Sequence, residues 1–148
     1  MGRADAEEVR AELAALAAAE DWEGLLQVAN TALKPLGDDV VVLNHAARAR
    51  LALAAPEDLA AAVAEARGWL DTALGRSPGQ AESLYLRGLA EYLAGDGPAA
   101  EDYWRQAWQA DPQRAAARDG LIRVWTEAGR LPEWGVAVVE SALADTGG

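Results

Sequence analysis

The stretch that decides the fold runs from residue 81 to residue 114 and reads AESLYLRGLAEYLAGDGPAAEDYWRQAWQADPQR. Both of its halves are built from strong helix formers such as Ala, Leu, Glu and Arg. Gly95-Asp96-Gly97 separates the halves, Pro98 suits the first turn of a new helix, and Asp111-Pro112 closes the second half. The stretch therefore predicts a helical hairpin with helices at 81–94 and 98–110.

The breaks of this hairpin recur along the chain at a fixed distance. Ser77-Pro78 returns as Asp111-Pro112, 34 residues later, and Gly95 returns as Gly129 at the same spacing. A period of about 34 with two helices in each period is typical of a helical-hairpin solenoid. A single hairpin cannot bury its own apolar face, so neighbouring hairpins must stack. The residues that follow this period in series are Ala73, Ala107 and Ser141, and also Leu74, Trp108 and Ala142.

The rest of the chain also predicts helix. Alanine makes up roughly a quarter of the residues, β-branched residues are few, and Val40-Val41-Val42 is the one run that suggests a strand. Glycine and proline punctuate the apolar periodicity at short intervals. Besides the central hairpin, six further helices are predicted at about 6–19, 22–34, 39–54, 56–75, 115–128 and 132–144.

The central stretch resembles the tetratricopeptide repeat (TPR) family. The residues that carry the likeness are Leu84, Gly88, Gly95-Asp96, Ala100, Trp104, Ala107 and Asp111-Pro112. The resemblance implies an all-α, right-handed solenoid of about four hairpins, in one domain over residues 1–148. The repeats would lie at about 6–34, 39–77, 81–114 and 115–145. The distance from Ala32 to Ala73 is 41 instead of 34, and two extra helical turns in the 56–75 helix account for the difference.

Composition excludes several classes of protein. The chain has 148 residues, no cysteine and a formal charge of −11, which removes disulfide frameworks and thiolate metal sites and disfavours phosphate backbones. No apolar stretch approaches the roughly 18–20 residues of a membrane span, and the charged start is not a secretory signal. We therefore expect a cytoplasmic protein that binds neither nucleic acid nor membrane.

Catalytic constellations are absent from the sequence. It has no GxSxG elbow, no GxxxxGK[ST] loop and no HExxH motif. Lys34 is the only lysine and His45 the only histidine, and we interpret His45 as a packing or groove residue. The sequence therefore predicts a protein that is not an enzyme, with no catalytic residue, no metal site and no cofactor.

The resemblance implies protein binding, because the family holds peptide segments of partner proteins on the concave surface formed by the first helix of each hairpin. Transferring the groove positions gives the candidate peptide-binding residues Arg10, Asn44, Arg48, Tyr85, Leu89, Tyr92 and Arg123. The arginines would recognise carboxylates and the tyrosines with Leu89 would form an apolar centre. The family's chaperone-tail binders use a Lys/Asn/Arg clamp, which is incomplete here because Ala14, Glu82 and Leu86 stand where polar or basic groups are required.

Two alternatives to this function remain open. The chain is also similar to small acidic secretion-type or assembly chaperones, which hold an apolar client segment, and it is compatible with a regulatory domain of a longer protein.

The last helix carries Val136, Val139 and Leu143 on a side away from its hairpin partner. Because a repeat array needs a cover on its last outer face, this side predicts a homodimer. The alternative is a monomer with a small apolar patch.

Overall fold

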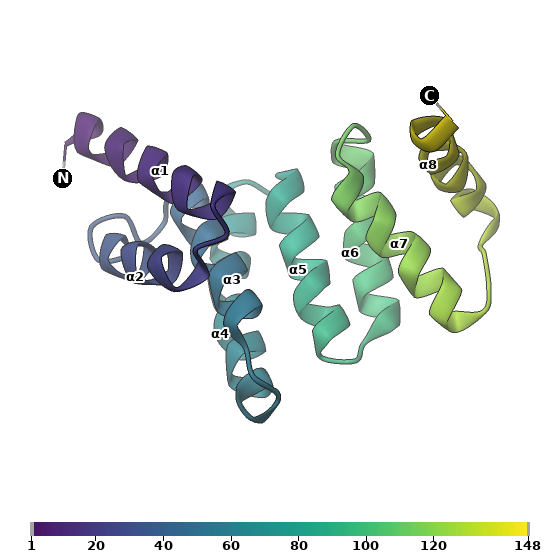
Figure 1. Cartoon of the computed structure of the whole chain (residues 1–148), viewed down its shortest axis with the longest axis horizontal. Coiled ribbons are helices and arrows are strands. Elements are labelled where there is room, and N and C mark those ends of the chain that lie inside the picture. The colour runs from purple at the N-terminus through teal and green to yellow at the C-terminus, as the bar shows by residue number, and fades with distance from the viewer. Residues whose placement is uncertain (1, 148) are drawn as a thin grey trace. The chain divides into compact units, whose positions relative to one another are not determined.

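The computed structural model describes residues 2–147 and is all-α, as predicted (Figure 1). Over these residues it has eight α-helices, two short 3₁₀ turns and no strand. The Val40-Val41-Val42 run lies in a helix. The elements are α1 (Arg3–Ala18), α2 (Trp22–Ala32), α3 (Val40–Leu53), η1 (Pro56–Asp58), α4 (Leu59–Arg76), α5 (Ala81–Leu93), α6 (Gly97–Ala110), α7 (Ala115–Ala128), η2 (Glu133–Gly135) and α8 (Val136–Gly147).

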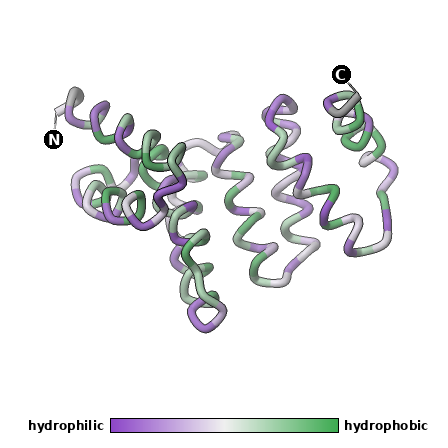
Figure 2. The backbone as a smooth tube through the Cα atoms, viewed as in Figure 1, coloured by the Kyte–Doolittle hydropathy of each residue, from purple (hydrophilic) through white to green (hydrophobic). Residues whose placement is uncertain are grey.

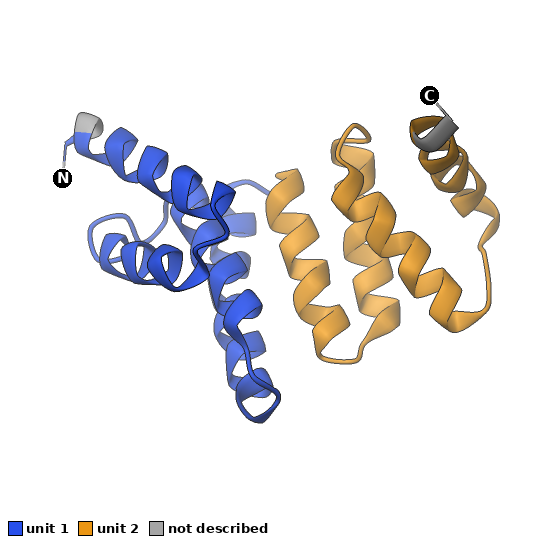
Figure 3. Ribbon diagram, in the orientation of Figure 1, with its two compact units in different colours: residues 1–78 blue, residues 79–148 orange. Residues whose placement is uncertain are grey.

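The chain divides into two units (Figure 3), unit 1 over residues 1–78 and unit 2 over residues 79–148. Within each unit, consecutive helices pack against one another, and the first helix also contacts the third. Along the helices, hydrophobic and hydrophilic residues alternate in bands (Figure 2), as expected for helices with one buried face. No helix among the described residues is both long enough and apolar enough to cross a membrane.

Polar side chains start several helices by accepting hydrogen bonds from backbone N–H groups that lack a partner within the helix. Asp21 caps α2, Asp39 caps α3 and Asp96 caps α6, each across 3.0–3.1 Å to the N–H three residues later. Gln80 caps α5 in the same way at Ser83. Such a cap is worth about 0.5–2 kcal/mol, so these side chains fix where the helices begin.

At two predicted helix starts, a short 3₁₀ turn precedes the α-helix. Pro56 and Pro132 were expected to begin α-helices, but 3₁₀ turns precede both α4 and α8. At the first of these turns, the Asp58 carboxylate accepts a hydrogen bond from the Ala55 N–H at 2.7 Å. It also forms an ion pair with Arg50 at 3.0 Å. These contacts tighten the turn, so the α-helix begins only at Leu59.

The two units share a register. α2 begins at Trp22 and α6 at Gly97, while α3 begins at Val40 and α7 at Ala115, so equivalent residues differ by 75 in number. The ends of α1 and α5 and of α3 and α7 follow the same shift. Residues of the first three helices of unit 1 can therefore be compared one by one with those of unit 2. The assignment of four repeats to the chain stays a prediction.

Candidate functional site

Unit 2 has a groove of about 440 Å³ between α5 and α7, with α6 beneath it. Four of the residues predicted from the sequence, Tyr85, Leu89, Tyr92 and Arg123, line this groove together. The other lining residues are Trp104, Ala116, Asp119 and Gly120. The groove therefore combines an apolar centre with one acidic and one basic side chain at its α7 wall.

Trp104 forms the floor of the groove because two glycines leave room for its ring. A Cβ atom added at Gly88 would lie 2.5 Å from the indole, and one added at Gly120 would lie 2.7 Å from it. The indole Nε1 donates a hydrogen bond to the carbonyl oxygen of Tyr85 at 2.9 Å. Trp104 is only 2% exposed. Its position is thus fixed by close packing on both sides and by a hydrogen bond from its one polar atom.

Two tyrosines of α5 pack on this indole. The Tyr85 ring is nearly parallel to that of Trp104, at 19° with 6.2 Å between centroids, and the Tyr92 ring is tilted by 36° at 5.6 Å. Both tyrosines are half-buried. Aromatic rings held in this way present a large contact area that costs little conformational entropy on binding, which is the property of residues that dominate protein interfaces.

Tyr92 also connects α5 to α7. Its hydroxyl donates to the Glu127 carboxylate, with oxygen–oxygen distances of 2.6 and 2.9 Å, and the Arg123 guanidinium lies 5.9 Å from its ring centroid. The hydrogen bond to Glu127 raises the pKa of the Tyr92 phenol, and desolvation and the negative charge of Glu127 act in the same direction. Tyr92 therefore remains neutral and a hydrogen-bond donor at physiological pH.

Ion pairs hold α7 in place beside the groove. Arg114 pairs with Glu82 of α5, and Arg118 pairs with Asp145 of α8 and with the neighbouring Asp119, whose oxygen is 3.1 Å from the guanidinium Nε. The hydrogen bonds to Asp145 and Asp119 raise the pKa of Arg118. Of the two charged residues that line the groove, Asp119 is therefore paired within unit 2.

The three candidates in unit 1 lie on α1 and α3 and have other contacts. Arg10 bridges α1 to α3 through Asp39, whose oxygen is 3.1 Å from the arginine Nε. Asn44 is buried, with 6% of its surface exposed. The guanidinium of Arg48, which is exposed, lies 5.2 Å from the ring centroid of Trp22. The role of these residues in peptide binding stays a prediction.

The Asp39 carboxylate of unit 1 is held by an arginine and by backbone N–H groups. Burial acts to raise its pKa, but the hydrogen bond from Arg10 and those from the N–H groups of Val42 and Val41 outweigh burial, so the pKa of Asp39 is lowered. The same hydrogen bond raises the pKa of Arg10. The Arg10 guanidinium thus joins α1 to the start of α3. Its contact with Asp39 would compete with a ligand for the same donor groups.

The candidates predicted from the sequence do not include the floor of the groove, Trp104, or the glycine of α7 beside it, Gly120. Trp104 lies on the second helix of its hairpin, whereas the family's groove positions lie on the first helices. Gly120 lies 32 residues after Gly88, two fewer than the period, so the repeat pattern does not single it out.

Comparison with known proteins gives likeness at the level of structure. No family model and no curated protein matches the sequence. The TPR domain of Sgt2 from Aspergillus fumigatus is 16% identical with a TM-score of 0.69, covering 84% of this chain and 80% of that one. TTC0263, a TPR protein of Thermus thermophilus, is 20% identical with a TM-score of 0.78, covering 92% and 71%. The chain has the TPR fold.

A third TPR structure similar to this chain contains a bound peptide. The first TPR domain of Spaghetti (RPAP3), bound to the HSP90 peptide SRMEEVD, is 12% identical with a TM-score of 0.70, covering 87% of this chain and 97% of that one. At such identities the likeness establishes the fold. The chemistry of the TPR groove in this chain has to be taken from its own residues.

Proposed function

We propose that this protein is a non-enzymatic interaction module of the cytoplasm, a scaffold that binds a peptide segment of a partner protein in the groove of unit 2. The observation that carries the proposal is the aromatic floor formed by Trp104 beneath Tyr85 and Tyr92. A half-buried aromatic surface with few charged groups is the composition of interface cores. The TPR fold and the peptide-bound neighbour support the same conclusion.

The chemistry of the groove indicates what kind of peptide fits. Leu89 and the aromatic rings would bury an apolar side chain, while Arg123 on α7 would pair with a carboxylate of the peptide. Because the clamp for a terminal carboxylate is incomplete in this sequence, we propose an internal segment with an apolar residue close to an acidic one. Arg10, Asn44 and Arg48 would extend binding into unit 1.

Selection from a random 12-residue peptide library displayed on phage tests the proposal. Affinities of the selected peptides are measured by fluorescence anisotropy for the wild type, Leu89→Ala and Arg123→Glu. The matched control is Arg76→Glu, the same charge reversal at an exposed residue of α4 in unit 1. We expect each groove variant to bind at least tenfold more weakly and the control to bind like the wild type. Peptides that bind all four proteins equally would contradict the proposal.

The same selection separates the proposal from its alternative, a small acidic chaperone that holds an apolar client segment. A chaperone of this kind would select peptides that are apolar throughout. Its binding would weaken in Leu89→Ala and remain unchanged in Arg123→Glu. Loss of affinity in both variants favours recognition of a mixed apolar and acidic segment.

Charge supports a protein partner over a nucleic acid. Unit 2 contains six arginines, no lysine and eleven acidic residues, which gives a net charge of −5. Phosphate backbones are repelled by such a surface. We expect no binding of single- or double-stranded DNA or RNA at micromolar concentration, and salt-dependent binding in that range would be incompatible with the proposed ligand.

We also propose that α8 mediates self-association. Val136 is 46% exposed and Leu143 is 64% exposed, while Val139 lines a shallow pocket with Trp125 and Leu131. A two-fold dimer would cover this apolar side with an identical copy. Sedimentation at tens of micromolar should show a dimer for the wild type and a monomer for Val139→Glu with Leu143→Glu. A monomeric wild type would support the alternative of a tolerated apolar patch.

A further inference from the structure

The register shared by the two units pairs a large residue with a glycine at the start of their second helices. α2 begins at Trp22, and α6 begins at Gly97, 75 residues later. The indole of Trp22 is half-buried against the core of unit 1, which includes Ala17 and Ala49. The guanidinium of Arg48 lies over its ring at 5.2 Å. Unit 1 therefore fills this place with an aromatic ring of its own.

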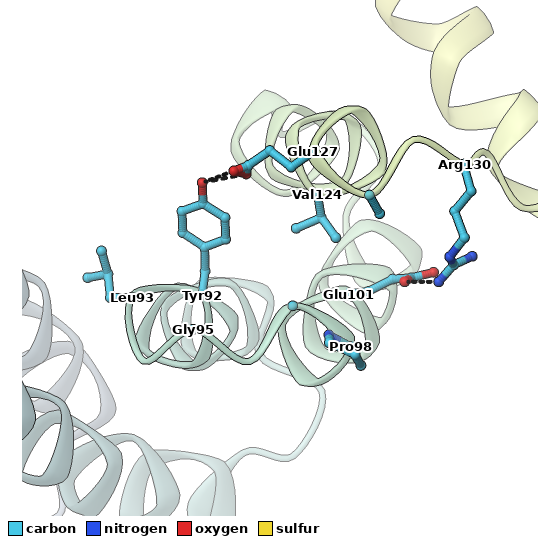
Figure 4. A pocket seen from close by; sticks show the side chains of 10 residues that line it. Tyr92, Leu93, Gly95, Pro98, Glu101, Val124, Glu127 and Arg130 are labelled. Atoms are coloured by element: carbon cyan, nitrogen blue, oxygen red, sulfur yellow. Dashed lines mark hydrogen bonds and ion pairs between the residues drawn. The ribbon is translucent and has the colours of Figure 1, made fainter.

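In unit 2 the corresponding place is open. A Cβ atom added at Gly97 would have a single neighbour within 4 Å, the Cγ1 atom of Val124, at 4.0 Å. Gly97 lines a pocket of about 540 Å³, within the range of about 300–1,000 Å³ that is usual for ligand sites. The residues around it come from the end of α5, the start of α6 and the end of α7 (Figure 4), and they include Tyr92, Glu101, Val124, Glu127 and Ala128.

Two residues of this pocket occupy register positions that belong to the core in unit 1. Tyr92 and Val124 stand at the register positions of Ala17 and Ala49, which belong to the core against which the Trp22 indole packs. Arg123 stands at the position of Arg48 and likewise lies over an aromatic ring, that of Tyr92. The pocket thus keeps apolar walls and a nearby arginine, and it lacks the ring that unit 1 supplies.

Two carboxylates at the pocket can accept a hydrogen bond from a ring that enters. Figure 4 shows Glu127 bonded to the Tyr92 hydroxyl and Glu101 paired with Arg130, the latter at 2.9 Å. Each carboxylate has more lone pairs than these contacts use. An indole N–H or a phenol O–H needs one acceptor when it is buried, and these carboxylates provide it.

We propose that this pocket binds the side chain of a tryptophan or tyrosine of a partner peptide, in the place that Trp22 takes in unit 1. Tyr92 lines both this pocket and the groove. A peptide in the groove therefore has an aromatic site beside it, near the C-terminal end of α5. The source of the ring, a peptide, rests on the proposed function, whereas the preference of the pocket for an aromatic ring does not.

A small probe tests the pocket without a peptide. N-acetyl-tryptophanamide and N-acetyl-leucinamide are titrated into ¹⁵N-labelled protein, and the amide signals of Gly95 and Val124 are followed by NMR. We expect the tryptophan amide to shift these signals and to bind at least fivefold more tightly than the leucine amide. Equal binding of the two amides, or shifts confined to residues away from the pocket, would overturn the proposal.

Variants that fill the pocket provide the second arm of the test. Gly97→Trp reproduces unit 1 and should weaken binding of the tryptophan amide at least tenfold, as should Ala128→Phe from the opposite wall. The control is Gly68→Trp on the exposed face of α4, where an added Cβ meets nothing within 4 Å. Because the two filling variants approach from different helices, one of them keeps the test decisive if the other fails to fold. Undiminished binding in a folded filling variant would overturn the proposal.

The two proposals fail in different ways. If the tryptophan amide binds at Gly95 and Val124 and no peptide is recovered from the library, the aromatic site is supported and the proposed function is contradicted. Peptides that bind in the groove, with no preference for the tryptophan amide, leave the proposed function intact and remove the aromatic site.

Discussion

The first hairpin of each unit has an equivalent site between its two helices, and the large side chain that fills this site comes from a different helix in each unit. In unit 1 the first helix contributes Leu13 and the second contributes Ala29, and neither has any exposed surface. In unit 2 the equivalent residues are Gly88 and Trp104, so the large side chain comes from the second helix and the small one from the first. Both arrangements keep the dense packing of a protein interior. Each hairpin therefore needs one large and one small side chain at this site, and either helix can carry the large one.

This exchange of size changes the surface above. Because Trp104 reaches between two glycines, its ring becomes the floor of a groove, and the α5 residues over it are aromatic or apolar. In unit 1 the equivalent positions of α1 hold one arginine and two alanines. The corresponding pairs are Arg10 with Tyr85, Ala14 with Leu89, Ala17 with Tyr92, Asn44 with Asp119 and Arg48 with Arg123. We therefore place the principal binding surface in unit 2.

The largest expected effect comes from breaking the exchange itself. Trp104→Ala should cost about 3–5 kcal/mol of unfolding free energy, and Gly88→Leu roughly 1–3 kcal/mol or more because it meets the indole. The double variant restores the arrangement of unit 1, so it should be more stable than Trp104→Ala alone. Urea denaturation of the four proteins measures the coupling. If the double variant loses as much as the two single variants together, the two sites do not share one space.

A second close contact tests the same packing on α6. Ala107 is 1% exposed, and Ala107→Leu should cost roughly 1–3 kcal/mol by overpacking. Because repeat arrays couple mainly to their neighbours, the loss should appear first in the hydrogen exchange of α5 and α6. A melting temperature equal to that of the wild type would show that the assigned register is wrong.

The turns that follow the first helices sharpen the comparison further. Glu20 has φ = 55° and Gly95, at the equivalent position, has φ = 86°. This left-handed region is strained for residues with a side chain and free for glycine. We expect Glu20→Gly to stabilise unit 1 by roughly 0.5–1 kcal/mol and Gly95→Ala to destabilise unit 2 by about 1 kcal/mol. Thermal melts that move in the same direction for both variants would contradict this assignment.

Acid should affect unit 1 through Asp39. Its folded pKa is lowered, so its contribution to stability is present above the unfolded value of about 3.9 and is lost as the pH falls through the folded value. Because Arg10 is 38% exposed, solvent screens the ion pair, and its contribution to stability should be small. Urea midpoints measured between pH 6 and pH 2.5 should fall less for Asp39→Asn than for the wild type. An identical fall would show that Asp39 does not carry the effect.

The smallest effect concerns the phenol in unit 2. The raised pKa of Tyr92 means that this group favours folding below pH 10 and loses that contribution as the pH rises through its folded value. In Glu127→Gln the pKa of Tyr92 should fall, because the negatively charged carboxylate that accepts the hydrogen bond from its hydroxyl is gone. Absorbance titration at 295 nm measures the difference. If Tyr92 titrates at the same pH in both proteins, the hydrogen bond to Glu127 is not what raises its pKa.

The fold could be predicted from the sequence because glycine, proline and aspartate mark nearly every turn. The family resemblance implies close helix contacts at Gly88 and Ala107, and both residues are buried. The groove was only partly predictable. Tyr85 and Tyr92 follow from the same resemblance, whereas the role of Gly120 depends on how α7 lies against Trp104. A contact between side chains of three helices has no signature in the spacing along the chain.

Mapping a selected peptide onto the protein by NMR tests the central claim most directly. The claim is that the aromatic groove of unit 2 is the principal binding surface. Amide signals of ¹⁵N-labelled protein are followed while a library-selected peptide is added. The account predicts that the largest shifts fall on Leu89, Tyr92, Gly120 and Arg123, with smaller shifts at Arg10 and Arg48. Shifts confined to α1 and α3, or to α8, would contradict it.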